Sequence, residues 1–237
     1  MSKAKKETTQ GKENNLVVAI VVALVLCVFV GIFIWAGKSK NDYTSTADKG
    51  QNSTISSTDS DTQQQEGLLD TSLTYYADIK VEDYGTVTVK LDPSSAPITC
   101  ANFVGLANVK FYDGLTFHRI IENFMIQGGD PKGNGTGGSD KNIVGEFASN
   151  GYNNTLSHTR GAISMARSGN PNSASSQFFI VHKDSPHLDG DYAVFGYVTE
   201  GIDVVDKVCA DAKPIDGNGT IPASAQPTIT SITIRTE

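Results

Sequence analysis

Hydrophobic and polar residues follow three different patterns along the 237-residue chain. Residues 16–37 are almost entirely apolar and carry no charged side chain, so a helix over them would cross a hydrocarbon core of about 30 Å. Residues 38–72 are rich in Ser, Thr, Asp and Gln, and a composition with so little apolar surface predicts a flexible, disordered linker. From residue 73 to 237, short apolar segments separated by turns predict a folded domain.

The N-terminal segments also predict how the chain is placed in the cell. Residues 1–15 contain four lysines, and a basic segment before a spanning helix favours the cytoplasmic side. We therefore expect a short cytoplasmic tail, one uncleaved transmembrane helix over residues 16–37, and a folded domain outside the cytoplasm at the cell membrane. A cleaved signal peptide, which would release a secreted protein, is the alternative hypothesis.

Alternation of apolar and polar residues predicts many short strands in the folded domain. These strands are expected at residues 77–81, 86–91, 117–121, 124–127, 161–166, 176–182, 192–198 and 227–237. The first two form a hairpin, with Asp83, Tyr84 and Gly85 at its turn. Short strands joined by turns indicate a mainly β fold, either a closed β-barrel or a sandwich.

Two helices are expected to cap this β structure. The stretch SSAPITCANFVGLANVKFYDG places Pro97 near a first helical turn, where proline is favoured. Phe103, Leu106 and Val109 would share one face of this helix. The stretch GIDVVDKVCADA predicts the second helix.

Charge and cysteine content exclude several classes of function. The net charge is −7, most of it on the folded domain, and an acidic domain does not favour non-specific binding of nucleic acid. The three cysteines form no C-x-x-C pair, and the four histidines show no metal-ligand spacing, so neither a metal nor another cofactor is expected. Cys100 and Cys209 are interpreted as free thiols, with a disulfide between them as the alternative.

A glycine-rich segment, residues 133–138, matches the G-x-G-x-x-G pattern of dinucleotide-binding loops. That function requires a helix directly after the glycines, and the sequence SDKNIVGEF that follows does not predict one. The glycines instead predict a surface loop that approaches a ligand closely.

The segment FHRIIENFMIQGGD, residues 117–130, places Arg119 within an otherwise apolar strand pattern. Arginine does not lose its proton in a protein, so this cation needs either a partner or a function. One hypothesis is a structural ion pair with Glu122 or Asp130. The other depends on the motifs that follow.

FHRIIENFMIQGGD, GNGTGG, SQFFI and LDGDYAVFG occur in this order. Together they resemble the cyclophilin family of peptidyl-prolyl cis–trans isomerases, over residues 73–237. The resemblance implies a closed eight-stranded antiparallel β-barrel with two capping helices, and isomerase activity of class EC 5.2.1.8. The expected partners are proline-containing polypeptides and, through the N-terminal helix, the membrane, with no nucleic acid or metal and a monomeric chain.

The resemblance also implies the site residues. Arg119 matches the catalytic arginine, and His118 beside it matches a structural position. The implied substrate-binding residues are Phe124, Met125, Gln127, Phe179 and Leu188 in the proline pocket and its rim, Gln177 and Ala166 in the groove for the residue before proline, and Arg167, His187 and Tyr192 near them.

Three of these positions depart from well-studied family members. Arg167 replaces an asparagine that holds substrate largely through its backbone, His187 replaces a tryptophan associated with cyclosporin binding, and Tyr192 replaces a histidine at the pocket rim. These differences concern drug sensitivity more than isomerase activity. His158 and His182, like His187, are expected at the surface or rim.

The chemistry of proline isomerisation agrees with such a site. The X–Pro bond rotates over a barrier near ~20 kcal/mol because the amide is conjugated. An apolar pocket that holds the ring, with a donor aimed at the prolyl nitrogen, stabilises the twisted amide more than either planar form. We therefore predict an isomerase that assists the folding of exported or surface proteins. A tethered module that binds proline peptides or acts as a chaperone with little turnover is the alternative.

Overall fold

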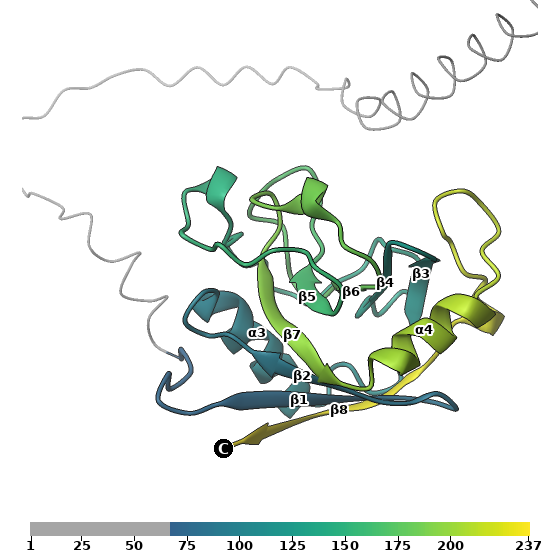
Figure 1. Cartoon of the computed structure of the whole chain (residues 1–237), viewed down its shortest axis with the longest axis horizontal. Coiled ribbons are helices and arrows are strands. Elements are labelled where there is room, and N and C mark those ends of the chain that lie inside the picture. Colours follow the sequence, from purple (N-terminus) through teal and green to yellow (C-terminus); the bar gives the residue numbers. More distant parts are fainter. Residues whose placement is uncertain (1–66) are drawn as a thin grey trace, which may run out of the picture. The chain divides into compact units, whose positions relative to one another are not determined.

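The computed structural model describes residues 67–237 (Figure 1). The predicted cytoplasmic tail, the predicted transmembrane helix and most of the predicted linker lie outside the described residues. Between residues 67 and 237, no helix combines the length and apolar character needed to cross a membrane. Leu69, in the last part of the predicted linker, packs against the hydrophobic core, six residues before the first strand begins at Tyr75.

Eight strands and two α-helices make up the domain. The strands are β1 (Tyr75–Val81), β2 (Gly85–Leu91), β3 (Phe117–Ile121), β4 (Met125–Gly128), β5 (Ala162–Met165), β6 (Phe178–Val181), β7 (Val194–Glu200) and β8 (Ile229–Thr236). The helices are α3 (Pro97–Asn108) and α4 (Ile202–Asp211), with three short 3-10 helices, η1 (Ala148–Asn150), η2 (Pro186–Leu188) and η3 (Ala223–Ala225). All eight predicted strands and both predicted helices are confirmed, whereas the 3-10 helices were not predicted.

The strands form one sheet in the order β3-β4-β6-β5-β7-β2-β1-β8, and every neighbouring pair is antiparallel. Its two edges, β3 and β8, meet through an isolated bridge between Thr116 and Thr228 and not through a continuous ladder. The pairing therefore establishes a mainly β fold with an eight-stranded antiparallel sheet and two helices. Full closure of the barrel stays a prediction.

The two helices lie apart from each other, α3 towards the left of the domain and α4 towards the right in Figure 1. Helix α3 packs against β8, and α4 packs against β2 and β4. On α4, Val204, Val205, Val208 and Cys209 are buried. Cys209 and Cys100 are both free and buried, which confirms the prediction of two thiols. Burial raises the pKa of Cys209 to about 12, so this thiol does not ionise at neutral pH.

The start of α3 is completed by a residue from far along the chain. Ala96 offers no side-chain cap, and Pro97 occupies the first turn. The buried carboxylate of Glu146 accepts hydrogen bonds from the backbone N–H groups of Ile98 and Thr99, at 3.0 and 2.7 Å. Since the first N–H groups of a helix lack internal partners, this carboxylate replaces a local cap.

One prediction for α3 is wrong. Phe103 is buried and Leu106 is partly buried, as expected for the inner face, but Val109 is 73% exposed. The helix ends at Asn108, and Val109 belongs to the turn that leaves the helix. The periodic pattern was extended one residue beyond the point where the backbone is helical.

The main core is built around aromatic side chains. The ring of Phe103 lies 5.2 Å from both Tyr112 and Phe195, and 5.5 Å from Phe178, measured between centroids. All four residues are fully buried. These contacts join α3 to β6 and β7, and so hold the strands that carry the site described next.

Candidate active site

Strands β3 and β4 form a hairpin that places Arg119 directly opposite Gln127 in the strand register. The turn between the strands contains Asn123, which has a left-handed backbone with φ of 63°. Asparagine tolerates this conformation better than most residues. This turn separates the two strands that were predicted at residues 117–121 and 124–127.

Two oxygen acceptors hold the guanidinium of Arg119. Its Nε donates to the backbone oxygen of Asn218 at 2.8 Å, and its Nη1 donates to Oε1 of Gln127 at 3.2 Å. The Cζ atom also lies 5.9 Å from the ring centroid of Phe124. Burial lowers the pKa of Arg119, but a guanidinium starts so high that it remains a cation.

An ion pair between Arg119 and Glu122 or Asp130 is not present among residues 67–237. The carboxylate of Asp130 instead accepts backbone N–H groups from the glycine-rich loop, including that of Gly135. The structural hypothesis for this cation is therefore wrong. The guanidinium of Arg119 instead lies beside an apolar surface.

That surface is a small hydrophobic cluster separate from the main core. Its buried members are Met125, Ala162, Phe179, Val181 and Val194, and its partly buried members are Ile121, Phe124, Leu156, Ala166, Leu188, Tyr192 and Tyr197. All the apolar residues predicted for the proline pocket are in this cluster. They come from β4, β6, the η2 segment and the turn after β3, so the sheet brings together positions that are far apart in sequence.

His158 supports the cluster from behind. Its ring stacks on Phe179 at 5.9 Å, with 13° between the planes. Nδ1 lies 2.8 Å from Asp189 and Nε2 lies 3.1 Å from the hydroxyl of Ser164. Burial lowers the pKa of His158, so the contact with Asp189 is a hydrogen bond of a neutral ring. The prediction of a surface or rim position for His158 is wrong, because the residue is 1% exposed.

A polar groove continues from Arg119 along a chain of hydrogen bonds. Nε2 of Gln127 donates to Oε1 of Gln177 at 2.9 Å, and Nε2 of Gln177 donates to the backbone oxygen of Gly137 at 2.7 Å. The groove has a cavity volume of about 350 Å³, and Ala166 and Arg167 also line it. The glycine-rich loop forms its other wall and opens no helix, as predicted.

Two of the departures from the family pattern contact each other. The guanidinium of Arg167 lies 4.6 Å from the ring centroid of Tyr192 and 5.0 Å from that of Phe147. Its Nε donates to the backbone oxygen of Asp191 at 2.9 Å. This cation therefore fixes the tyrosine ring at the rim, and is itself held by the loop that carries the tyrosine.

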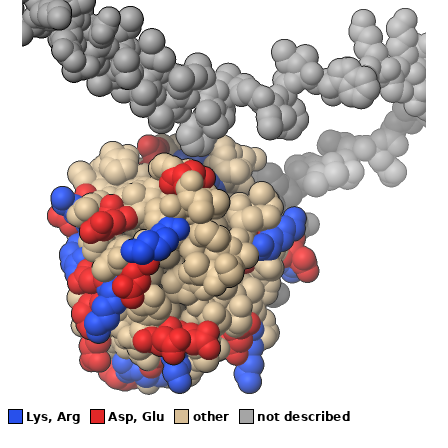
Figure 2. All heavy atoms as spheres, turned by 90° about the vertical axis from the view of Figure 1, so that its right-hand side faces the viewer, with Lys and Arg blue, Asp and Glu red and all other residues tan. Residues whose placement is uncertain are grey.

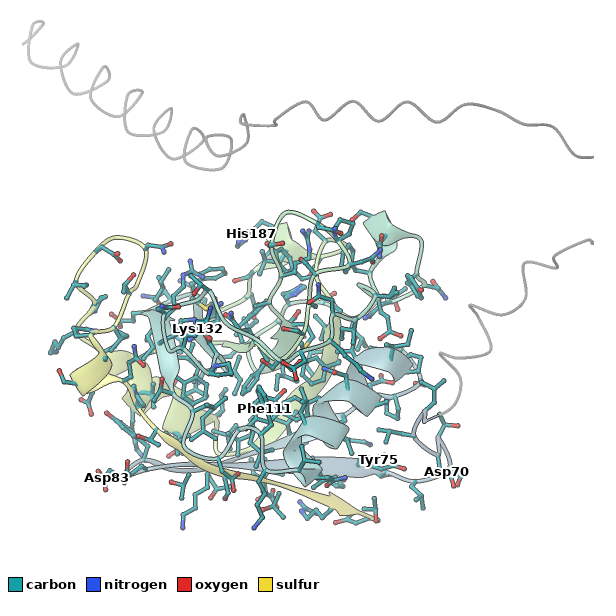
Figure 3. The ribbon with its side chains drawn as sticks, turned by 180° about the vertical axis from the view of Figure 1, so that it is seen from behind. Asp70, Tyr75, Asp83, Phe111, Lys132 and His187 are labelled. Carbon is teal, nitrogen blue, oxygen red and sulfur yellow. The ribbon has the colours of Figure 1, made fainter. Side chains whose placement is uncertain are left out.

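The other departure, His187, is exposed beside the pocket. Its ring centroid lies 5.6 Å from that of Phe124. Figure 3 places His187 at the end of the molecule opposite Tyr75 and Asp83. The pocket rim is thus at the loop-rich end of the domain, and the predicted rim position of His187 is confirmed.

His118, next to the arginine, points away from the pocket chemistry. It is 4% exposed, and neither ring nitrogen has a hydrogen-bond partner. Burial lowers its pKa, which keeps the ring neutral. Its burial agrees with the structural position that the family resemblance implies.

Some residues that shape the site were not predicted. Asn218 acts through a backbone oxygen, and its loop is fixed by the carboxylate of Asp216, which accepts the N–H groups of Asn218 and Thr220 at 3.0 Å. No side-chain pattern in a sequence identifies a carbonyl acceptor. Within residues 67–237, no group of three or more His, Cys, Asp or Glu side chains is arranged to hold a metal ion.

Together, the fold and the site define a class of protein: an antiparallel β domain that presents an apolar pocket with one held arginine, next to a polar groove. Such a site can bind an apolar ring and donate a hydrogen bond to it. The contact between Ser164 and His158 behind the pocket is buried, so it presents no nucleophile to a ligand.

Comparison with known proteins identifies the class. Residues 76–234 match the family model for cyclophilin type peptidyl-prolyl cis-trans isomerase/CLD. The chain is 49% identical over 123 residues to peptidyl-prolyl cis-trans isomerase B of Bacillus subtilis, covering 52% of this chain and 82% of that protein. It is 46% identical over 137 residues to a peptidyl-prolyl cis-trans isomerase of Helicobacter pylori, covering 57% of this chain and 81% of that protein.

A solved structure agrees. The cyclophilin type isomerase of Cryptosporidium parvum, crystallised in the presence of the dipeptide Ala-Pro, superposes with a TM-score of 0.60 at 31% identity. The match covers 68% of this chain and 99% of that chain. The chain belongs to the cyclophilin family and is a peptidyl-prolyl cis–trans isomerase, EC 5.2.1.8.

Proposed function

We propose that this isomerase accelerates X–Pro rotation by donating a hydrogen bond from Arg119 to the prolyl nitrogen. As the amide twists, conjugation is lost and the nitrogen gains a lone pair that can accept a proton donor. The planar cis and trans forms lack this acceptor. A donor at this position therefore stabilises the transition state more than either ground state.

The observation that carries this proposal is the way Arg119 is held. Its Nε and Nη1 are occupied by Asn218 and Gln127, which fixes the plane of the guanidinium at the edge of the apolar cluster. Nη2 makes no hydrogen bond to residues 67–237, so it is the nitrogen that we assign to the substrate. A cation that is already oriented loses little side-chain entropy when it donates.

The apolar cluster supplies the other half of the mechanism. Phe179 and Met125 are 5% and 1% exposed and form a rigid floor, whereas Phe124 and Leu188 are only partly buried. We assign the proline ring to the space between them. The groove beside Gln177 and Ala166 would receive the residue before proline, as the resemblance implies.

An isomerase assay on the full-length chain tests the role of Arg119. We expect Arg119→Ala to lower kcat/KM for a proline peptide at least tenfold, ~1.4 kcal/mol or more of lost differential stabilisation. Arg119→Lys keeps the charge without the planar fork and is expected to recover only part of the activity. Unchanged circular dichroism and melting temperature are the folding control.

The same assay separates the two functional classes. If wild-type protein binds the peptide but turns it over no faster than the uncatalysed rate, the tethered binding or chaperone module is correct. If Arg119→Ala turns over like the wild type, the proposed donor is wrong. Exchange NMR measures both binding and turnover in one sample.

We also propose that the domain is held outside the cytoplasm by a transmembrane helix over residues 16–37, and acts as a monomer on exported or surface proteins. The uncharged apolar run and the lysines before it support this placement. Protease treatment of intact cells should digest the domain, and mass spectrometry should find the intact N-terminus in the membrane fraction. A free, N-terminally processed domain in the medium would instead identify a secreted protein.

A further inference from the structure

His182, which follows β6, connects the turn of the active-site hairpin to helix α4. Its Nδ1 accepts the backbone N–H of Asn123 at 2.9 Å. Its own backbone N–H donates to the backbone oxygen of Phe124 at 2.8 Å. One residue therefore holds the peptide groups on both sides of the Asn123–Phe124 peptide, in the turn that carries Phe124.

The opposite side of the ring is also fixed. Nε2 of His182 lies 3.1 Å from Asp206 on α4. Asp206 also binds Nη2 of Arg160 at 2.8 Å, and Nη1 of Arg160 donates to the backbone oxygen of His182 at 2.7 Å. The His182 side chain is only 14% exposed, although rim exposure was predicted. These contacts fix the orientation of the imidazole, with Nδ1 directed towards Asn123.

This arrangement selects one protonation state of the ring. Because Nδ1 accepts from Asn123, it cannot carry a proton, so the neutral ring has its proton on Nε2, facing Asp206. A doubly protonated ring would direct an N–H at the N–H of Asn123 and lose this hydrogen bond. The contact with Asp206, by contrast, would survive protonation.

The charged groups near the ring come from α4, from the turn and from the segment before β5. Asp206 and Asp184 are acidic, and Glu122 lies in the turn itself, whereas Arg160 is a cation that already pairs with Asp206. Cys209 of α4 lies among Asp206, Glu122 and Arg160, and burial keeps it a neutral thiol. Protonation of the ring would leave the contact with Asp206 in place and remove the hydrogen bond that holds the turn.

The turn depends on this acceptor. Asn123 has φ of 63°, a conformation that costs a non-glycine residue energy unless its surroundings hold it. The ring centroid of the next residue, Phe124, lies 5.6 Å from the ring centroid of His187 and 5.9 Å from Cζ of Arg119. A relaxed turn would move this ring relative to both.

We infer that His182 is a positioning residue for isomerisation: its unprotonated Nδ1 fixes the turn at Asn123, which sets Phe124 at the pocket rim, and protonation of the ring releases the turn. Activity therefore falls in acid. The inference rests on the proposed role of Phe124 in the proline pocket, and it adds a residue outside the pocket that controls the pocket's geometry.

Three substitutions separate positioning from simple structural support. His182→Asn places an amide oxygen near the position of Nδ1, so it can accept from Asn123 and cannot be protonated. His182→Gln places its amide near Nε2, so it can reach Asp206 without accepting from Asn123. His182→Ala removes both contacts. Asp203→Ala is the matched control, because it removes an exposed ion pair with Lys207 on α4 and leaves the turn untouched.

The measurement is kcat/KM by exchange NMR on the full-length chain, from about pH 5 to pH 8, with a proline peptide that has no titratable side chain. We expect wild type and Asp203→Ala to lose activity towards acid. His182→Asn should keep activity within about twofold of wild type at neutral pH and show no acid decline. His182→Gln and His182→Ala should lose about threefold or more at neutral pH, near ~0.7 kcal/mol.

The chemical shift of the Asn123 amide proton reports whether each variant keeps the hydrogen bond. A variant that loses this bond with unchanged activity overturns the inference, and so does an acid decline in His182→Asn equal to that of wild type. Arg119→Ala is measured alongside. Its failure to lower activity would reject the donor mechanism without altering the ranking of the His182 variants, so the two proposals fail separately.

Discussion

The domain contains two hydrophobic clusters that differ in what surrounds them. In the main core, Phe103, Tyr112, Phe178 and Phe195 are fully buried and contact one another. In the pocket cluster, a few buried residues such as Met125 lie beneath a layer of partly exposed rings. The aromatic centre of the first cluster has no apolar surface left to bury, whereas the second cluster has.

The polar groups next to each cluster differ in the same way. The main core borders backbone groups and the buried Glu146, which are satisfied within the domain. The pocket cluster borders Arg119 and the glutamine chain that holds it. The two clusters therefore have different roles. The core stabilises the fold, and the pocket presents apolar surface and a cation to the substrate.

Phe103→Ala in the main core gives the strongest test of this division. Deleting a fully buried aromatic ring is expected to lower the free energy of unfolding by about 3–5 kcal/mol, because it removes apolar contacts and leaves a cavity. Urea denaturation measures the loss. In the fraction that remains folded, kcat/KM should stay within about twofold of wild type. A large loss of specific activity in folded protein would show that the clusters are not separable.

Phe124→Ala in the pocket cluster should have the opposite profile. We expect kcat/KM to fall about tenfold, ~1.4 kcal/mol, because the ring forms the pocket wall and contacts the Arg119 guanidinium. The free energy of unfolding should fall by only about 1 kcal/mol, since the side chain is partly exposed. Thermal melts and the exchange assay on one preparation provide the comparison, and a stability loss as large as that of Phe103→Ala would contradict it.

Gln127 allows a finer test, because it joins the arginine to the groove. Gln127→Ala is expected to lower kcat about three- to fivefold, near the ~1 kcal/mol of one hydrogen bond, as the guanidinium loses an acceptor. Gln127→Glu keeps an acceptor for Arg119 but cannot donate to Gln177. If kcat follows the arginine contact, the glutamate variant keeps more activity than the alanine variant. Equal losses would assign the effect to the groove.

The smallest expected effect concerns pH and two buried histidines. Burial lowers the pKa of His118 and of His158, so the unfolded chain binds protons at about pH 6.5 that the folded domain does not. Their contribution to stability is full above that pH and is lost as the pH falls through the lower folded values.

Urea denaturation at pH 7.5 and at pH 5.5 should therefore show a lower free energy of unfolding in acid, by on the order of 1 kcal/mol or less for each histidine. His118→Leu should reduce the difference between the two conditions. Val109→Ala, which changes an exposed side chain that does not titrate, should leave the difference unchanged. A difference that is the same in all three proteins would place its origin in other groups.

The strand pattern was predictable because each strand buries one face in a fixed period of two. Arg119 was also predictable, because a permanent cation within an apolar run demands an explanation. The position of His158 was not, since its burial follows from a stack with Phe179 and a carboxylate, Asp189, from a distant segment. Its neighbours in the sequence are polar and indicate nothing about its depth.

By itself, the sequence determined the β class of the domain, the family, and the residue types that the chemistry requires, because these depend on local periodicity and on motifs. Only the tertiary structure decided how Arg119 is oriented, because its partner Asn218 offers a backbone oxygen that any residue would have. The same holds for His182 and the turn at Asn123. Contacts across long sequence separations, made through backbone groups, leave no mark on the pattern of side chains.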